Sequence, residues 1–86
     1  MIWSVDFTPA ARRDFDRLDG TVQNRVSRKI DELEDKGPLI AGVKMLHSAD
    51  RLYRVRVGDW RIIYQVEFKR SAITIAHILH RSEAYR

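Results

Sequence analysis

Residues 53–64 read YRVRVGDWRIIY and consist of two β-favouring runs that flank Gly58-Asp59. Two turn-forming residues of this kind, with glycine first, predict a tight β-hairpin between two strands. A two-residue turn also fixes which residues lie opposite each other across the strands. The expected pairs are Val57 with Trp60, Arg56 with Arg61, Val55 with Ile62, Arg54 with Ile63, and Tyr53 with Tyr64.

This register predicts that the hairpin has two chemically different faces, because side chains alternate along a strand. One face consists of Tyr53, Val55, Val57, Trp60, Ile62 and Tyr64, and the other carries Arg54, Arg56 and Arg61. Like charges opposite each other cost roughly 0.2 to 1 kcal/mol, so folding alone does not favour three grouped arginines. A guanidinium group binds phosphate in a bidentate manner and stays charged near neutral pH. We therefore predict a phosphate-binding face, with an ordinary solvated strand face as the alternative.

The chain before the hairpin predicts one strand followed by two helices. Residues 2–7 form a short β-favouring run that ends at Thr8-Pro9, a suitable N-cap and first helical position. Asp19-Gly20 interrupts the first helix, and Lys36-Gly37-Pro38 ends the second. Apolar residues recur at helical spacing, at Ala11, Phe15 and Leu18 and then at Val22, Val26, Ile30 and Leu33. We expect an antiparallel helical hairpin whose apolar stripe packs on a sheet.

The remainder of the chain predicts a loop and three strands. The loop extends from about residue 39 to residue 50, and the strands cover residues 52–57, 60–68 and 72–79, with a looser turn at 69–71. The expected order is β-α-α-β-β-β, an α+β domain with an antiparallel-rich sheet packed against the helical hairpin. At this length we expect a single domain over residues 1–86.

Composition narrows the classes of function. The chain has 16 Lys and Arg against 12 Asp and Glu, a net charge of +4, which favours a polyanionic partner. The absence of Cys leaves no thiolate nucleophile, disulfide or cysteine-ligated metal site, and is consistent with a reducing compartment, so we expect a cytoplasmic protein. No secretory leader is recognisable, and no apolar run reaches the roughly 18 residues of a membrane span.

The last seven residues, 80–86, read HRSEAYR and bring an imidazole, two guanidinium groups, a carboxylate and a phenol close together. Such a segment is either a plain polar tail or part of a site. The hairpin pattern followed by His80-Arg81 and then Tyr85 resembles the RelE branch of the RelE/ParE toxin superfamily. The resemblance covers nearly the whole chain. It implies a toxin that cleaves mRNA in the ribosomal A site, inhibits translation and is paired with a cognate antitoxin protein.

The resemblance also implies site residues. Arg54 and Arg56 match two basic positions that are lysines in the best-known members, so at these positions the chain carries groups that cannot exchange a proton near neutral pH. Arg61 matches the arginine after the turn, Arg81 the arginine that ends the last strand, and Tyr85 the C-terminal tyrosine. We expect all five to be catalytic, together with His80. RNA is expected to bind Arg54, Arg56, Arg61 and Arg86.

The implied reaction is attack of an RNA 2′-hydroxyl on the adjacent phosphate, which needs a base, an acid and positive charge around the phosphate. We expect Arg61 and Arg81 to hold the phosphate. His80 is the best candidate for proton transfer, because an unperturbed imidazole has a pKa of about 6.5. Tyr85 is expected to stack on a base or to assist, and Glu83 is a weaker candidate base. No metal or small-molecule cofactor is expected.

Two further interpretations stay open. A ParE-like toxin has the same fold but inhibits DNA gyrase without cleaving nucleic acid, and the grouped arginines with His80-Arg81 favour the nuclease over it. His77 is expected to be a hydrogen-bonded core or sheet residue, and His47 a surface residue in the loop. The antitoxin is expected to be an acidic, partly disordered segment that covers the arginine face, which we expect to be exposed, or the helical hairpin.

Overall fold

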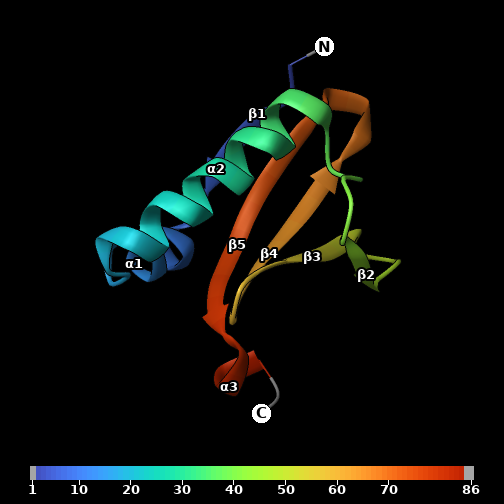
Figure 1. Cartoon of the computed structure of the whole chain (residues 1–86). Coiled ribbons are helices and arrows are strands. Elements are labelled where there is room, and N and C mark those ends of the chain that lie inside the picture. Colours follow the sequence, from blue (N-terminus) through green and yellow to red (C-terminus); the bar gives the residue numbers. More distant parts are fainter. Residues whose placement is uncertain (1, 85–86) are drawn as a thin grey trace.

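The computed structural model describes residues 2–84 and shows an α+β fold with a mixed sheet, as predicted (Figure 1). Within the described residues the strands are β1 Ser4–Phe7, β2 Lys44–His47, β3 Leu52–Val57, β4 Trp60–Glu67 and β5 Ala72–His80. The helices are α1 Pro9–Asp16, α2 Gly20–Lys36 and α3 Arg81–Ala84, and a short 3-10 turn, η1, covers Phe68–Arg70. The sheet order is β1-β5-β4-β3-β2, with β1 parallel to β5 and the other pairs antiparallel.

The helix boundaries follow from local chemistry that the sequence predicted. The Oγ1 atom of Thr8 accepts a hydrogen bond from the backbone N–H of Ala11 at 3.1 Å, which caps α1. Asp19 caps α2 in the same way. Gly37 ends α2 with a φ of 93°, and a Cβ atom there would lie 2.9 Å from the indole nitrogen of Trp3, so this position requires glycine.

The hydrophobic core lies between the two long helices and one face of the sheet (Figure 1). Helix α1 contacts β1 and β5, and α2 contacts β1 and β3. The fully buried side chains include Val26 and Leu33 of α2 and Ile62, Tyr64 and Ile75 of the sheet. The predicted helical stripes therefore pack on the apolar face of the predicted hairpin.

The predicted hairpin register is confirmed at every expected pair, from Val57 with Trp60 to Tyr53 with Tyr64. Gly58 has a φ of 60°, and Asp59 is not among the residues of positive φ, which matches a turn with glycine at its first central position. The Tyr64 hydroxyl donates a 2.6 Å hydrogen bond to the carbonyl oxygen of Pro38. Burial, and to a smaller extent the neighbouring Tyr53, raises the pKa of this hydroxyl well above its ordinary value.

The prediction of a continuous loop over residues 39–50 was wrong, because β2 lies within it. This strand pairs with β3, with an irregular register between Met45 and His47. All four residues of β2 are exposed. A strand with no buried face does not need alternating apolar and polar residues, and the segment KMLH shows no such alternation from which a strand could have been predicted. The strands β1, β4 and β5 differ from their predicted bounds only at their ends. No helix among residues 2–84 is long and apolar enough to span a bilayer.

Candidate phosphate-binding site

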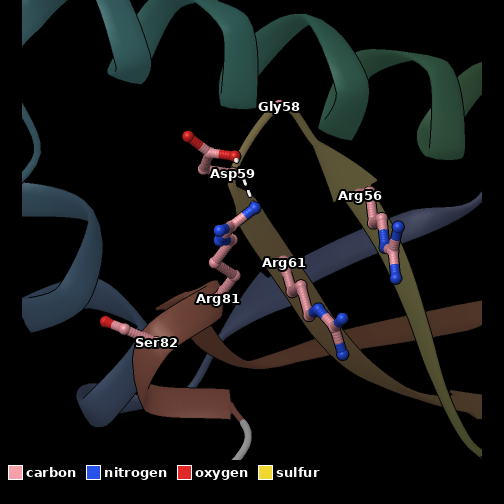
Figure 2. A pocket seen from close by; sticks show the side chains of 6 residues that line it. All are labelled: Arg56, Gly58, Asp59, Arg61, Arg81 and Ser82. Carbon is pink, nitrogen blue, oxygen red and sulfur yellow. Dashed lines mark ion pairs between the residues drawn. The ribbon is translucent and has the colours of Figure 1, made fainter.

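An open pocket of about 370 Å³ lies at the end of the sheet where the β3–β4 turn meets the start of α3 (Figure 2). Three arginines contribute to it from three different segments: Arg56 from β3, Arg61 from β4 and Arg81 from the start of α3. The complete lining is Arg56, Gly58, Asp59, Arg61, Arg81 and Ser82. The hairpin and the C-terminal segment, which are separated in sequence, therefore form one site.

Backbone pairing holds the three arginines in place. Arg56 and Arg61 are directly opposite each other next to the turn, and Figure 2 shows their side chains running along the same side of the hairpin. The backbone N–H of Arg81 donates a 2.8 Å hydrogen bond to the carbonyl oxygen of Asp59. This bond ties the beginning of α3 to the hairpin turn, so the position of Arg81 is set by the same turn that sets the other two arginines.

The pocket is cationic. Its lining includes three guanidinium groups and one carboxylate, that of Asp59, so the lining side chains carry a formal charge of +2 (three positive, one negative). An Arg81 nitrogen lies 3.8 Å from a carboxylate oxygen of Asp59, and the two side chains are 68% and 66% exposed. Ion pairs this exposed contribute about 1 kcal/mol or less. A phosphate can therefore compete with Asp59 for the Arg81 guanidinium.

The prediction of a uniformly exposed arginine face was wrong. Arg56 is exposed, but Arg54 and Arg61 retain only 7% and 9% of their accessible surface. Arg54 of β3 pairs with Ile63 of β4 on one side and with Lys44 of β2 on the other, so the strand that sequence reasoning missed flanks it. Arg54 is not a lining residue of the pocket, and the structure does not bring it together with Arg81 there.

His80 is also outside the lining of this pocket. It is paired with Trp60, and the two rings meet edge to face with centroids 5.1 Å apart. Because side chains alternate along β5, His80 lies on the same face of the sheet as the buried Ile78, whereas Arg81 is the first residue of α3. The Nδ1 atom of His80 lies 3.0 Å from the Ser82 hydroxyl, and Ser82 does line the pocket.

The remaining predicted residues are distributed as follows. Tyr85 and Arg86 lie outside the described residues. Glu83 lines a different pocket, and its carboxylate accepts a long, 3.4 Å hydrogen bond from the backbone N–H of His80. His77 is an exposed residue of β5 whose Nδ1 lies 3.5 Å from Asp14, and His47 is an exposed residue of β2 whose Nδ1 lies 3.1 Å from Asp50. Within residues 2–84 no three His, Asp or Glu side chains are grouped to hold a metal ion.

Sequence reasoning missed three lining residues, namely Gly58, Asp59 and Ser82. The turn residues Gly58 and Asp59 were assigned a purely local role, although a turn next to two cationic strand residues necessarily borders the site that those residues form. Ser82 carried no signal beyond its position between Arg81 and Glu83. Taken together, the lining offers planar cationic donors, an exposed counter-ion in Asp59 and a hydroxyl, a combination suited to binding a phosphate group.

Comparison with known proteins gives a consistent result. The family model of the ParE toxin of type II toxin-antitoxin systems matches residues 5–85. Toxin RelG of Mycobacterium tuberculosis is 26% identical over 86 residues, which is 100% of this chain and 99% of that protein.

Solved structures of similar fold include the archaeal RelE-RelB complex from Pyrococcus horikoshii OT3, with a TM-score of 0.82 and 27% identity, covering 94% of this chain and 97% of that one. The isolated E. coli RelE toxin has a TM-score of 0.78 at 22% identity, covers 96% of this chain and 95% of that one, and supports the fold alone. The family model, the sequence relative and the fold all agree with the resemblance noted in the sequence. The chain therefore belongs to the ParE toxin family of type II toxin-antitoxin systems, and within the RelE/ParE superfamily it is a RelE-type toxin.

Proposed function

We propose that this toxin is a metal-independent endoribonuclease that cleaves mRNA in the ribosomal A site and so inhibits translation. The observation that carries the proposal is the convergence of Arg56, Arg61 and Arg81 on one open pocket. Three guanidinium groups in one place are unfavourable for folding but favourable for binding a polyanion. The similarity to proteins named RelE and RelG supports the same conclusion.

In this proposal the 2′-hydroxyl of the bound nucleotide attacks the adjacent phosphorus and the bond to the 5′-oxygen breaks. The 2′-hydroxyl proton goes to a base, and the leaving 5′-oxygen receives a proton from an acid, which gives a 2′,3′-cyclic phosphate and a 5′-hydroxyl. Arg61 and Arg81 stabilise the charge that develops on the phosphate oxygens, with Arg56 beside them at the pocket. Arg54, which is outside the lining, adds positive charge from within the sheet.

Proton transfer is assigned to the C-terminal segment. His80 is the proposed acid or base, and its contact with Ser82 links the imidazole to a hydroxyl that lines the pocket. Arginine cannot serve here, because its pKa is above 12. Tyr85 is proposed to stack on a base or to assist, and Arg86 to bind the RNA backbone.

The proposed partners are the ribosome with its mRNA and a cognate antitoxin. The relative from Pyrococcus horikoshii was solved as a complex with RelB, which supports an antitoxin for this chain. An acidic antitoxin segment would complement the net charge of +4 and the cationic pocket.

The test is a translation assay with purified ribosomes and an mRNA whose cleavage ends are mapped. The wild-type protein should cut in the A site. Arg61→Ala and Arg81→Ala should each lower single-turnover cleavage by roughly a hundredfold, since one charge-stabilising donor of this kind is typically worth about 3 kcal/mol. Arg70→Ala is the matched control, because Arg70 lies in η1 at the opposite end of β4 and is well exposed. It should cleave at the wild-type rate.

Two results would contradict the proposal. Cleavage at the wild-type rate by both Arg61→Ala and Arg81→Ala would remove these residues from the reaction. Absence of A-site cleavage by the wild-type protein, together with inhibition of gyrase supercoiling, would replace the nuclease with a ParE-like gyrase inhibitor. For His80, the pH dependence of the cleavage rate should change in His80→Ala, and an unchanged profile would exclude proton transfer by this imidazole.

A further inference from the structure

A fourth arginine reaches the rim of the pocket from a helix that sequence reasoning treated only as packing. Arg25 is an exposed residue of α2, and its side chain ends against Gly58 at the tip of the hairpin. A Cβ atom at Gly58 would lie 3.0 and 3.1 Å from the two terminal nitrogens of Arg25 and 3.4 Å from Cζ. The two nitrogens are nearer than the carbon, so the forked end of the guanidinium group points at the turn.

The position is open because residue 58 is glycine. With a φ of 60° and no side chain, Gly58 allows the Arg25 guanidinium group to approach the backbone of the turn (Figure 2 shows Gly58 at the tip, next to α2). Gly58 is itself a lining residue of the pocket that contains Arg56, Arg61 and Arg81. The Arg25 charge is therefore separated from that pocket only by the width of the turn.

Within the described residues 2–84, no carboxylate pairs with the guanidinium group of Arg25. Among the ion pairs and side-chain hydrogen bonds of residues 2–84, none involves Arg25, although carboxylates pair with Lys29 and Arg70 elsewhere. A guanidinium group has five N–H donors, and because Arg25 is exposed these donors are accessible to an external anion. An external anion can therefore act as the hydrogen-bond acceptor for the Arg25 guanidinium group.

The charges of α2 are also segregated along the helix. Three cationic residues, Arg25, Arg28 and Lys29, precede the acidic residues Asp31, Glu32, Glu34 and Asp35, and a further lysine, Lys36, ends the helix. The cationic part is the one that meets the hairpin turn at Gly58. A polyanion that leaves the pocket across this turn therefore encounters positive charge on α2.

We propose that Arg25 forms a second phosphate subsite, across the β3–β4 turn from the first, and binds the backbone of the RNA strand next to the cleaved phosphate. The inference rests on the proposed function for the identity of the strand, and adds that α2 takes part in holding it. Arg25 acts as a positioning residue, because it increases binding of the strand and leaves the reacting phosphate to Arg61 and Arg81.

The experiment measures binding of a short, single-stranded, 2′-O-methylated RNA, which cannot be cleaved by 2′-hydroxyl attack, over a range of salt concentrations. Arg25→Gln should weaken binding by about tenfold, the effect of losing one charged hydrogen bond. It should also lower the slope of log K against log salt by about 0.7, the value for one phosphate contact on a single strand. Arg25→Lys should retain the slope. Arg70→Gln is the matched control and should bind like the wild-type protein.

On ribosomes, Arg25→Gln should raise the toxin concentration needed for half-maximal cleavage and leave the rate at saturation unchanged. Wild-type affinity and slope in Arg25→Gln, or an equal loss in Arg70→Gln, would overturn the inference while cleavage by the wild-type protein keeps the proposed function. If the wild-type protein binds RNA through Arg25 but no ribosomal mRNA is cleaved, the proposed function fails and the phosphate subsite stands.

Discussion

The two faces of the β3–β4 hairpin have the same backbone pairing and opposite chemistry. The face toward the helices carries Val55, Ile62 and Tyr64, all but fully buried, whereas the other face carries Arg56 opposite Arg61. The first face gains stability from apolar burial, and the second loses some of it to like-charge repulsion. The comparison teaches that one strand pair can specify the fold with one face and form a binding site with the other.

The largest expected effect comes from breaking the apolar face. Ile62→Ala removes a side chain with 0% exposure and leaves a cavity in the hydrophobic core, so the free energy of unfolding should fall by about 2 to 5 kcal/mol. Denaturant unfolding followed by circular dichroism measures this change. A loss of less than about 1 kcal/mol would mean that the helices do not depend on this face.

The matching change on the cationic face should lower the cleavage rate strongly and the free energy of unfolding only slightly. Arg61→Met keeps much of the apolar stem and removes the charge, so the free energy of unfolding should fall by less than it does in Ile62→Ala. Ribosomal cleavage should fall by roughly a hundredfold. Equal losses of stability in Arg61→Met and Ile62→Ala would contradict the separation of the two faces.

Tyr64 sharpens the comparison because it carries a polar group on the apolar face. Its pKa in the fold is above the ordinary value of about 10, so above that pH the native state keeps a proton that the unfolded chain loses. The free energy of unfolding should therefore fall as the pH rises above about 10. Tyr64→Phe should cost about 1 kcal/mol near neutral pH, through the lost hydrogen bond to Pro38, and should show a weaker alkaline decline. An unchanged decline would assign it to another group.

The smallest expected effect concerns the counter-ion of the pocket. Asp59→Asn should change the free energy of unfolding by about 1 kcal/mol or less, because the contact with Arg81 is exposed. It should also tighten binding of single-stranded RNA a few-fold at low salt, since the pocket loses its only carboxylate among the described lining residues. Weaker binding in Asp59→Asn would show that Asp59 positions Arg81 and does not compete with the RNA.

Several parts of the site were predictable from the sequence, and others were not. The turn at Gly58 and the pair Arg56 with Arg61 follow from local spacing, which a two-residue turn converts directly into register. The burial of Arg54 was not predictable, since it depends on β2, a strand with four exposed residues and no apolar alternation. The separation of His80 from the pocket was not predictable either, since β5 extends one residue further than predicted and places His80 against Trp60.

The sequence by itself determined α1, α2, the hairpin, its register and the presence of a cationic cluster, because each of these follows from interactions between residues close in the chain. Only the tertiary structure decided which charged groups share the pocket. The hydrogen bond from Arg81 to Asp59 and the approach of Arg25 to Gly58 join segments that are distant in sequence. Such contacts depend on how the sheet and α2 pack against each other, and no local pattern of residues encodes that packing.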